Sequence, residues 1–484
     1  MIELNCLPTV DSPIKFGTDG WRGVIAADFT FERVAKVAPV AAQVLADLYG
    51  NITGSRTIVV GYDRRFQAEE FARVAAEAIS TAGFNVLLSE CSAPTPAFSW
   101  AVKQQNALGA LVMTASHNPP AYLGLKVKGY FGGSVPPEVT QQIEAQLKKE
   151  SFNSVSPGAV NYFNPWPSYC QELQGKVDIA EIKKAIASSA ITVFADVMHG
   201  AAASGLQQIL QENIREINSD RDPLFGGNPP EPLPRYLSQL FRLVRLYHRT
   251  NQKLALAFVF DGDSDRIAAV DTQGNFLSSQ ILIPILIQHL SERRGYSGEV
   301  VKTVSCSDLI PRVAELYNLP VYETPIGYKY IGDRMLATSV LIGGEESGGI
   351  GYGNHIPERD ALLSALYLLE AVVFSGKDIG ELYHNLQQKT NFFSTYDRLD
   401  LPLANMQVRA RLLSQLQTHP LKEIAGKSVL DCNTIDGYKF RLSDHSWLLI
   451  RFSGTEPVLR LYCEAPTSEQ VHQTLTWAKN WALT

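Results

Sequence analysis

Three carboxylates stand at alternate positions directly after an apolar segment. Residues 254–260 are all apolar and run into Asp-Gly-Asp-Ser-Asp-Arg. Asp261, Asp263 and Asp265 therefore follow a predicted buried strand, where their negative charge needs a counter-ion. Carboxylate oxygens favour a hard cation, usually Mg2+ where a phosphate completes a small set of protein ligands. A solvated turn is the alternative. An EF-hand is excluded, because the sixth and twelfth residues of the segment are arginine and threonine instead of glycine and glutamate.

A second apolar segment leads to a serine in the same way. Residues 110–113 precede Thr-Ala-Ser-His-Asn-Pro, so Ser116 and His117 stand on a strand-end loop. A serine hydroxyl is a weak nucleophile unless a base, a metal or a pre-existing phosphate assists it. The GxSxG elbow is missing, which disfavours an α/β-hydrolase. By its residues alone the loop is explained equally well by a turn and by a nucleophile, and His117 can assist the serine or cap the turn.

Phosphate-binding groups gather near the carboxyl terminus, in Arg-Phe-Ser-Gly-Thr-Glu-Pro. Arg451 can make bidentate bonds to phosphate oxygens, and Ser453, Gly454 and Thr455 offer hydroxyl and backbone donors. The spacing is not that of a Walker A loop. A plain hairpin turn is the alternative.

Three further loops are rich in glycine, namely residues 17–23, 327–330 and 343–349. The glycines of the last loop do not fit GxGxxG, which disfavours a nicotinamide cofactor. Glu345 and Ser347 in this loop suit sugar hydroxyls, because they accept and donate hydrogen bonds. Each loop taken alone is also explained by a turn.

The elements that must position these loops alternate between short β-branched runs and longer amphipathic stretches, which indicates βαβ units and an α/β fold. Open α/β sheets bind ligands at the carboxyl ends of their strands. The tail differs, with two strands and a closing helix typical of a small α+β domain. The strands predicted are 57–60, 110–113, 191–194, 254–260, 299–304, 339–342, 447–452 and 458–464, and the helices include 68–82, 137–150, 361–374 and 468–482.

Bulk properties indicate a globular chain of several domains. A chain of 484 residues is too long for a single hydrophobic core, so about three or four domains are expected. With 43 basic and 49 acidic residues and no basic stripe, nucleic acid is disfavoured as a partner. The longest apolar run, 281–287, contains a proline and predicts a buried helix, so no membrane span is expected. The amino terminus lacks a signal pattern, which favours a cytoplasmic location. The six scattered cysteines indicate reduced thiols, with Cys306 a core residue.

Four motifs stand out, in this order: Thr-Ala-Ser116-His-Asn-Pro, Asp-Gly-Asp-Ser-Asp-Arg266, Gly-Glu345-Glu-Ser347-Gly and Arg451-Phe-Ser-Gly-Thr-Glu-Pro. Taken together, they resemble the motifs of the α-D-phosphohexomutase superfamily, which includes phosphoglucomutase and phosphomannomutase. The resemblance covers essentially the whole chain. It implies three related α/β domains with mixed, mainly parallel sheets and a C-terminal α+β domain around a central cleft. We expect these domains at residues 1–160, 161–270, 271–390 and 391–484.

The resemblance also implies a role for each site residue. Ser116 would carry a phosphoryl group, and one Mg2+ would bridge it to Asp261, Asp263 and Asp265. Lys126 would be the general acid/base, with a pKa that neighbouring positive charge must lower. The remaining roles fall to Arg22, His117 and Arg266 in catalysis, Glu345 and Ser347 at the sugar, and Lys329, Arg451, Ser453, Gly454 and Thr455 at the phosphate that does not react.

These roles imply a mutase that interconverts hexose 1-phosphate and hexose 6-phosphate through a hexose 1,6-bisphosphate. Gly349, where many phosphomannomutases and phosphoglucosamine mutases carry histidine, favours glucose, as does Gly-Tyr-Lys329. Glucose 1,6-bisphosphate is then the expected intermediate and activator, and the state expected is a monomer or homodimer. A bisphosphate synthase, a phosphomannomutase, a phosphatase and a silent sugar-phosphate sensor are the alternatives.

Overall fold

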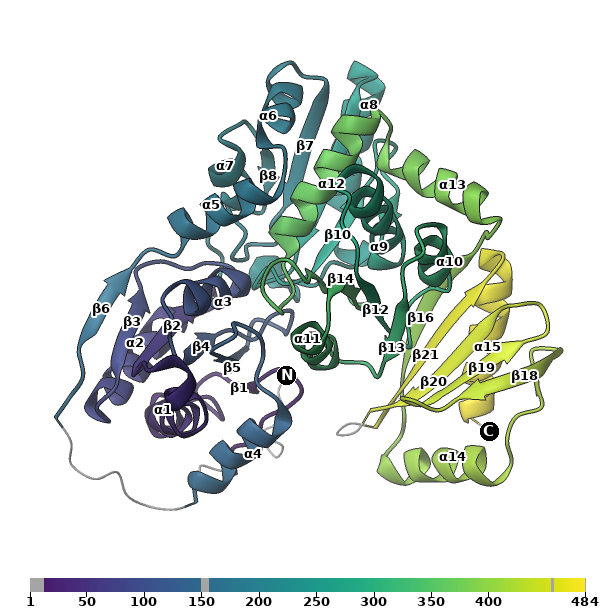
Figure 1. Ribbon diagram of the computed structural model, residues 1–484. Helices are drawn as coiled ribbons and strands as arrows, with labels where there is room; N and C mark the ends of the chain where they lie inside the picture. Colours follow the sequence, from purple (N-terminus) through teal and green to yellow (C-terminus); the bar gives the residue numbers. More distant parts are fainter. Residues whose placement is uncertain (1–12, 149–155, 454–456, 484) are drawn as a thin grey trace.

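The computed structural model describes residues 13–148, 156–453 and 457–483. Four sheets follow one another along the chain and form an arc in space, from β6 on the left to β18 on the right (Figure 1). The first three sheets are mixed and carry helices, and the fourth is antiparallel. This architecture confirms the expected α/β fold with four domains.

The first domain contains a six-stranded sheet in the order β1-β5-β4-β2-β3-β6. Its inner strands are apolar and buried on both faces, as parallel strands covered by helices must be. The antiparallel strands β1 and β5 extend one edge. The strands are β1 Trp21–Val24, β2 Thr57–Tyr62, β3 Asn85–Ser89, β4 Gly109–Met113, β5 Tyr122–Gly129 and β6 Val160–Phe163, and the helices are α1 Phe31–Thr53, α2 Ala68–Thr81, α3 Thr95–Gln104 and α4 Pro137–Gln146.

The second domain contains a five-stranded sheet in the order β11-β10-β9-β7-β8. Its central strand β9 has the bounds that the apolar run predicted. The strands are β7 Ile191–Asp196, β8 Arg215–Ile217, β9 Leu254–Phe260, β10 Ile267–Val270 and β11 Phe276–Leu277, and the helices are α5 Trp166–Lys176, α6 Ile179–Ala187, α7 Gly205–Leu210 and α8 Ser238–Asn251.

The third domain contains a four-stranded sheet in the order β13-β12-β14-β15. The apolar run at 281–287 lies in the buried helix α9, as predicted. The strands are β12 Glu299–Thr303, β13 Val321–Thr324, β14 Val340–Gly344 and β15 Ile350–Tyr352, and the helices are α9 Ser279–Gln288, α10 Leu309–Leu316, α11 Tyr328–Ala337, α12 Ala361–Ser375 and α13 Ile379–Thr390.

The fourth domain contains an antiparallel sheet in the order β16-β21-β20-β19-β18-β17. The two strands and the closing helix predicted for the tail are present. The strands are β16 Thr395–Pro402, β17 Glu423–Ile424, β18 Lys427–Asn433, β19 Tyr438–Leu442, β20 Trp447–Phe452 and β21 Val458–Ala465, and the helices are α14 Met406–Thr418 and α15 Ser468–Leu483.

Four of the motifs singled out in the sequence occupy the same place in their sheets. The loops of interest join two antiparallel neighbours: β4 to β5 around Ser116, β9 to β10 around the aspartates, β14 to β15 around Glu345, and β20 to β21 after Arg451. The chain thus turns back on itself at the end of a buried strand in every domain.

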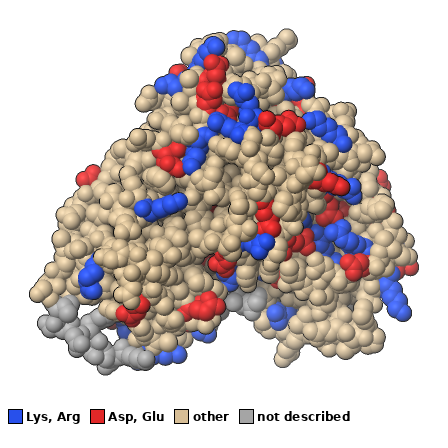
Figure 2. All heavy atoms as spheres, viewed as in Figure 1, with Lys and Arg blue, Asp and Glu red and all other residues tan. Residues whose placement is uncertain are grey.

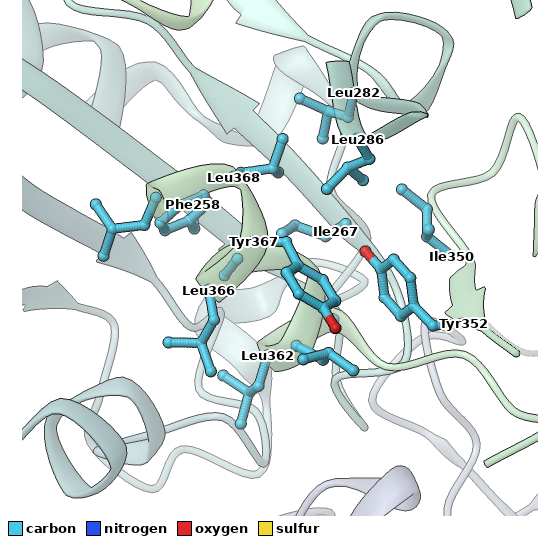
Figure 3. Packing of buried hydrophobic residues seen from close by; sticks show 14 of the residues in the cluster. Phe258, Ile267, Leu282, Leu286, Ile350, Tyr352, Leu362, Leu366, Tyr367 and Leu368 are labelled. Atoms are coloured by element: carbon cyan, nitrogen blue, oxygen red, sulfur yellow. The ribbon is translucent and has the colours of Figure 1, made fainter. Parts of the chain in front are cut away.

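One apolar core extends through the first three domains. It joins α3 and β4 of the first domain to β9 of the second and α12 of the third. Helix α12 is buried along most of its length, and the ring of Tyr367 on it packs edge-on against Tyr352, with the ring centres 4.9 Å apart (Figure 3). The fourth domain has its own core between its sheet and its helices. Charged side chains are scattered over the face shown in Figure 2 with both signs mixed, in keeping with the absence of a basic stripe in the sequence. Among the described residues, no helix is both long and apolar enough to cross a membrane.

Candidate active site

Ser116 is held in a strained turn that points its hydroxyl at the second domain. Its backbone has φ +52°, in the left-handed region that non-glycine residues rarely adopt. The side chain of Thr114 accepts a hydrogen bond from the Ser116 amide at 2.9 Å, which stabilises the turn. The Ser116 hydroxyl donates to Asp261 Oδ2 at 2.8 Å. The serine and the first aspartate, which lie far apart in the sequence, are therefore in direct contact.

A buried arginine stabilises this turn by hydrogen bonds to its carbonyl oxygens. The guanidinium of Arg65 has no exposed surface and donates to the carbonyl oxygens of Ser116 at 2.6 Å and Asn118 at 2.7 Å. It also donates at 3.0 Å to the carbonyls of Pro119 and Tyr122, on the way into β5. Its Nε lies 3.4 Å from Oδ2 of the buried Asp63. One charged group thus binds four carbonyls of the segment that leads from Ser116 into β5.

The three aspartates form a compact, fully buried group. One oxygen of each lies within 4.8 Å of the others, and all three residues are 0% exposed. Burial and the charges of Asp263 and Asp265 raise the pKa of Asp261 well above its usual value. The Oδ1 atoms of Asp263 and Asp265 have no hydrogen-bond partner among the described residues. Buried, unsatisfied carboxylate oxygens at this spacing fit a small divalent cation, and oxygen-only ligands suit Mg2+.

Lys126, on β5, lies among carboxylates. Its Nζ is 2.8 Å from Asp263 Oδ2, 2.8 Å from Asp265 Oδ2 and 2.9 Å from Asp19 Oδ2. Burial lowers the pKa of Lys126, but these three carboxylates raise it more, so it lies above its ordinary value. The sequence-based expectation of a pKa lowered by positive charge is therefore wrong for these contacts. Neighbouring cationic charge is present in Arg359, but its effect on this pKa is smaller.

Arg359 reaches this group from the third domain. Its Nη2 lies 2.9 Å from Asp19 Oδ2 and 2.7 Å from Asp265 Oδ2, and its Nη1 is 3.6 Å from Glu345 Oε2. The backbone before it is anchored, because Glu358 pairs with the buried Lys128 of β5. The first three domains therefore meet in one charged cluster in which basic and acidic groups alternate.

The three other expected catalytic residues line the same loops. His117 Nδ1 lies 3.3 Å from the Ser116 hydroxyl. Burial, Arg266 and Arg22 all lower the pKa of His117, so the ring is neutral at neutral pH. Arg22 donates to Asn118 Oδ1 at 2.7 Å and lies 3.6 Å from Asp19. Arg266 Nε is 3.9 Å from Asp265 Oδ1.

Glu345 joins the cluster through Arg359 and through the backbone. Burial raises the pKa of Glu345 to about 7, although Arg359 opposes the rise. Its loop is tied to the aspartate loop, because the Ile267 amide donates to the Gly348 carbonyl at 3.0 Å. A Cβ at Gly349 would lie 2.4 Å from Arg359 Cδ, so Arg359 occupies the space of a side chain at 349. Ser347 is partly exposed on the same loop.

The residues expected at the non-reacting phosphate lie on the third and fourth domains. Lys329, at the start of α11, has its Nζ 4.9 Å from the centre of the Tyr330 ring. Arg451 Nε donates to Asp436 Oδ2 at 3.0 Å. Ser453 is buried, and its amide donates to Val458 at 3.0 Å. Gly454 and Thr455 lie outside the described residues.

Sequence reasoning missed Asp19, Arg65 and Arg359. Asp19 stands in the glycine-rich segment 17–23, from which only Arg22 was selected. Arg65 follows strand β2 in Asp63-Arg-Arg, and Arg359 precedes the apolar run of α12 in Glu-Arg-Asp. Adjacent opposite charges at the edge of an apolar element were the available signal, because buried charges must be paired.

Comparison with known proteins assigns all four domains. Residues 13–154, 167–274 and 278–390 match the phosphoglucomutase/phosphomannomutase alpha/beta/alpha domains I, II and III, and residues 405–476 match the C-terminal domain of the same family. The chain is similar to a phosphoglucomutase/phosphomannomutase of Thermococcus kodakarensis, with 28% identity over 95% of this chain and 96% of that protein. A phosphoglucosamine/phosphogalactosamine mutase of Sulfurisphaera tokodaii is 29% identical over 93% of this chain and 95% of its own length.

A solved structure supports the same assignment. A protein of Thermus thermophilus, provisionally named a phosphomannomutase, superimposes with a TM-score of 0.84 and 32% identity over 98% of this chain and 100% of its own. The chain belongs to the α-D-phosphohexomutase superfamily. It is an isomerase of the phosphohexomutase class, whose substrates are hexose phosphates.

Proposed function

We propose that this chain interconverts glucose 1-phosphate and glucose 6-phosphate through a phosphoserine at Ser116 and glucose 1,6-bisphosphate. The observation that carries the proposal is the 2.8 Å contact between the Ser116 hydroxyl and the buried aspartate group. At this distance a phosphate on that hydroxyl can share a cation with Asp261. Mg2+ bound there would neutralise charge on the transferring phosphoryl group.

The residues of this chain divide the transfer between them. In the first step the bond between Ser116 Oγ and phosphorus breaks, and a sugar hydroxyl oxygen bonds to the phosphorus. Arg22 and Arg266 flank the loop and stabilise the equatorial oxygens. In the second step the other phosphate of the bisphosphate returns to Ser116. His117, neutral and 3.3 Å from the hydroxyl, orients Oγ.

Lys126 is the proposed general acid/base. As an ammonium it donates a proton to the departing oxygen. To accept the proton of the sugar hydroxyl it must first be neutral, and the three carboxylates that touch it oppose this. The proposal therefore requires that a cation bound at the aspartates weakens their ion pairs with Lys126 and so lowers the pKa of this lysine. Glu345 and Ser347 contact the sugar hydroxyls, and Lys329, Arg451, Ser453, Gly454 and Thr455 bind the second phosphate.

Glucose is the preferred sugar in this proposal because Gly349 stands where many phosphomannomutases and phosphoglucosamine mutases carry histidine, and because Gly-Tyr-Lys329 resembles the loop of glucose-type members. Relatives with a similar overall sequence carry phosphomannomutase and phosphoglucosamine mutase names, so mannose and glucosamine are the competing sugars. Turnover of glucose, mannose and glucosamine 1-phosphates should be compared side by side. A preference for mannose or glucosamine phosphate would contradict the glucose assignment and leave the phosphoserine mechanism intact.

Ser116→Ala tests the mechanism. We expect turnover to fall by at least about 1,000-fold, while glucose 6-phosphate still binds in calorimetry. Mass spectrometry should find one phosphoryl group on the peptide that contains Ser116 in the parent chain and none in the variant. Ser99→Ala is the matched control, because Ser99 is a buried serine of the same domain whose hydroxyl has no hydrogen-bond partner among the described residues.

Two results would overturn the proposal. Substantial activity of the Ser116→Ala chain would exclude the phosphoserine. Free glucose 1,6-bisphosphate that accumulates without net isomerisation would identify a bisphosphate synthase, and inorganic phosphate released at the same rate would identify a phosphatase.

A further inference from the structure

One carboxylate joins the two loops to which we assign the non-reacting phosphate. Asp436 lies in the turn between β18 and β19 of the fourth domain. Its Oδ2 accepts a hydrogen bond from the Ile326 amide at 3.0 Å and another from Arg451 Nε, also at 3.0 Å. Ile326 immediately precedes Gly327 and helix α11, on which Lys329 stands. A single oxygen atom therefore bridges the third domain to the arginine of the fourth.

The turn that carries Asp436 lies directly against β20. Gly437 adopts φ +94°, and a Cβ on it would lie 2.6 Å from the Ile450 carbonyl oxygen. Tyr438 then pairs with Ile450 in the ladder between β19 and β20. Because the glycine lets the turn close directly on β20, Asp436 has a fixed position beside Arg451, the next residue along that strand.

Asp436 bonds to Nε of Arg451 and leaves the two terminal nitrogens of the guanidinium to other partners. The carboxylate takes the single N–H on Nε, whereas bidentate binding of a phosphate can use the two terminal nitrogens. An arginine held at Nε loses less side-chain freedom when a ligand arrives, and pre-organisation of this kind raises affinity. Asp436 thus constrains the guanidinium without needing to contact the ligand.

The surrounding contacts show that the two domains are packed together at this point. Val304 and Ile326 of the third domain pack with Trp447, Leu449 and Tyr462 of the fourth. Asn433, three residues before Asp436, donates to Glu323 Oε1 at 2.9 Å across the same junction. Asp436 and Asn433 both make interdomain hydrogen bonds, but of the two only Asp436 also bonds to Arg451.

We propose that Asp436 is a positioning residue for the phosphate that does not react: it orients Arg451 and fixes the start of α11, so that Lys329 and Arg451 act as one site. The proposal rests on the proposed function, which places that phosphate at these loops. Asp436→Asn tests the charge, because the amide oxygen can still accept from Ile326 while the negative charge opposite Arg451 is lost.

Binding of glucose 6-phosphate, measured by calorimetry on the full chain, tests the inference together with steady-state kinetics. In Asp436→Asn we expect Kd and KM to rise about tenfold, with kcat changed less than about threefold, because a bond that only orients a binding group affects affinity before chemistry. Asp436→Ser, a smaller residue that also keeps an acceptor, should give the same result. Asn433→Ala is the matched control and should remain within about twofold of the parent chain.

The decisive comparison uses Arg451→Ala. If Asp436 acts through Arg451, adding Asp436→Asn to Arg451→Ala should change Kd no further. Equal effects of Asp436→Asn in both backgrounds would overturn the inference, as would an unchanged Kd in Asp436→Asn when Arg451→Ala binds weakly. If Arg451→Ala itself binds normally, the assignment of the phosphate to this loop is wrong, and the proposed function fails at that site.

Discussion

Replacement of Arg65 by methionine should damage both the stability of the first domain and the chemistry at Ser116. The substitution keeps an unbranched side chain of similar length but removes the donors to four loop carbonyls. It also leaves Asp63 buried without its cation. Loss of one partner of a buried ion pair costs about 3–5 kcal/mol. At about 2–4 °C per kcal/mol for a domain of this size, the first thermal transition should fall by roughly 6–20 °C.

The pH dependence of this loss distinguishes the ion pair from simple packing. Burial raises the pKa of Asp63 to about 6, although Arg65 and Thr114 oppose the rise. The folded chain therefore holds a proton that the unfolded chain releases at lower pH, and stability falls as the pH rises toward about 6. Without Arg65 the pKa of Asp63 moves higher still. The deficit of Arg65→Met relative to the parent chain should then grow between pH 6 and pH 8.

Thermal melting at pH 6 and pH 8 measures this difference, and Asp63→Asn in the same chain is the matched control. The double variant cannot ionise at residue 63, and the Thr114 hydroxyl can reverse to accept from the new amide. It should recover part of the loss and show the same deficit at both pH values. Turnover of Arg65→Met should fall about 100-fold, because the Ser116 loop loses its anchors. Melting and activity close to those of the parent chain would refute the role given to Arg65.

Two further predictions concern the third domain. Gly349→Ala places a Cβ 2.4 Å from Arg359 Cδ and should displace the Arg359 guanidinium from the aspartates. We therefore expect kcat/KM to fall about tenfold in the mutase assay. Gly50→Ala is the control and should leave kcat/KM unchanged, because a Cβ at residue 50 would have no atom within 4 Å. Glu345, with a pKa of about 7, is ionised only above that pH, so kcat/KM should rise between pH 6 and pH 8. Glu345→Gln should lack the part of this rise that belongs to Glu345, and an identical pH profile in both chains would contradict its role.

The strand-end loops were predictable because their signals are local. An apolar run of seven residues followed by three alternating aspartates defines both the strand β9 and the charge at its end. Helix α9 was equally clear from its apolar residues. Strand β5 was not predicted, because Tyr122–Gly129 contains two lysines and two glycines. Each of those buried lysines pairs with a carboxylate from another domain, Lys126 with Asp263 and Lys128 with Glu358. Only the family resemblance indicated a role for Lys126.

The residues that sequence reasoning missed were missed for one physical reason: their partners lie far away in the sequence. Arg359 pairs with Asp19 from 340 positions away, and Arg65 binds carbonyls more than 50 positions further along the chain. The partners of Arg65 come together when the first domain folds, and Asp19 meets Arg359 when the first and third domains pack. Within the sequence each is an ordinary charged residue in a loop, and such residues are usually solvated. Their burial follows from tertiary packing and has no local pattern in the sequence.

The apolar cores divide the four domains into a joined group of three and a separate fourth domain. The first three domains, which hold the serine, the aspartates and Arg359, are joined by one continuous core. The fourth has a separate core and meets the third through a small apolar cluster and a few polar bonds, Asp436 among them. A bisphosphate that must turn over between two transfers needs a fixed reacting centre and a phosphate site that can release and bind again. We therefore expect the joined core of the first three domains to hold the reacting groups in place, while Asp436 keeps Arg451 beside the start of α11 as the sugar phosphate is released and bound again.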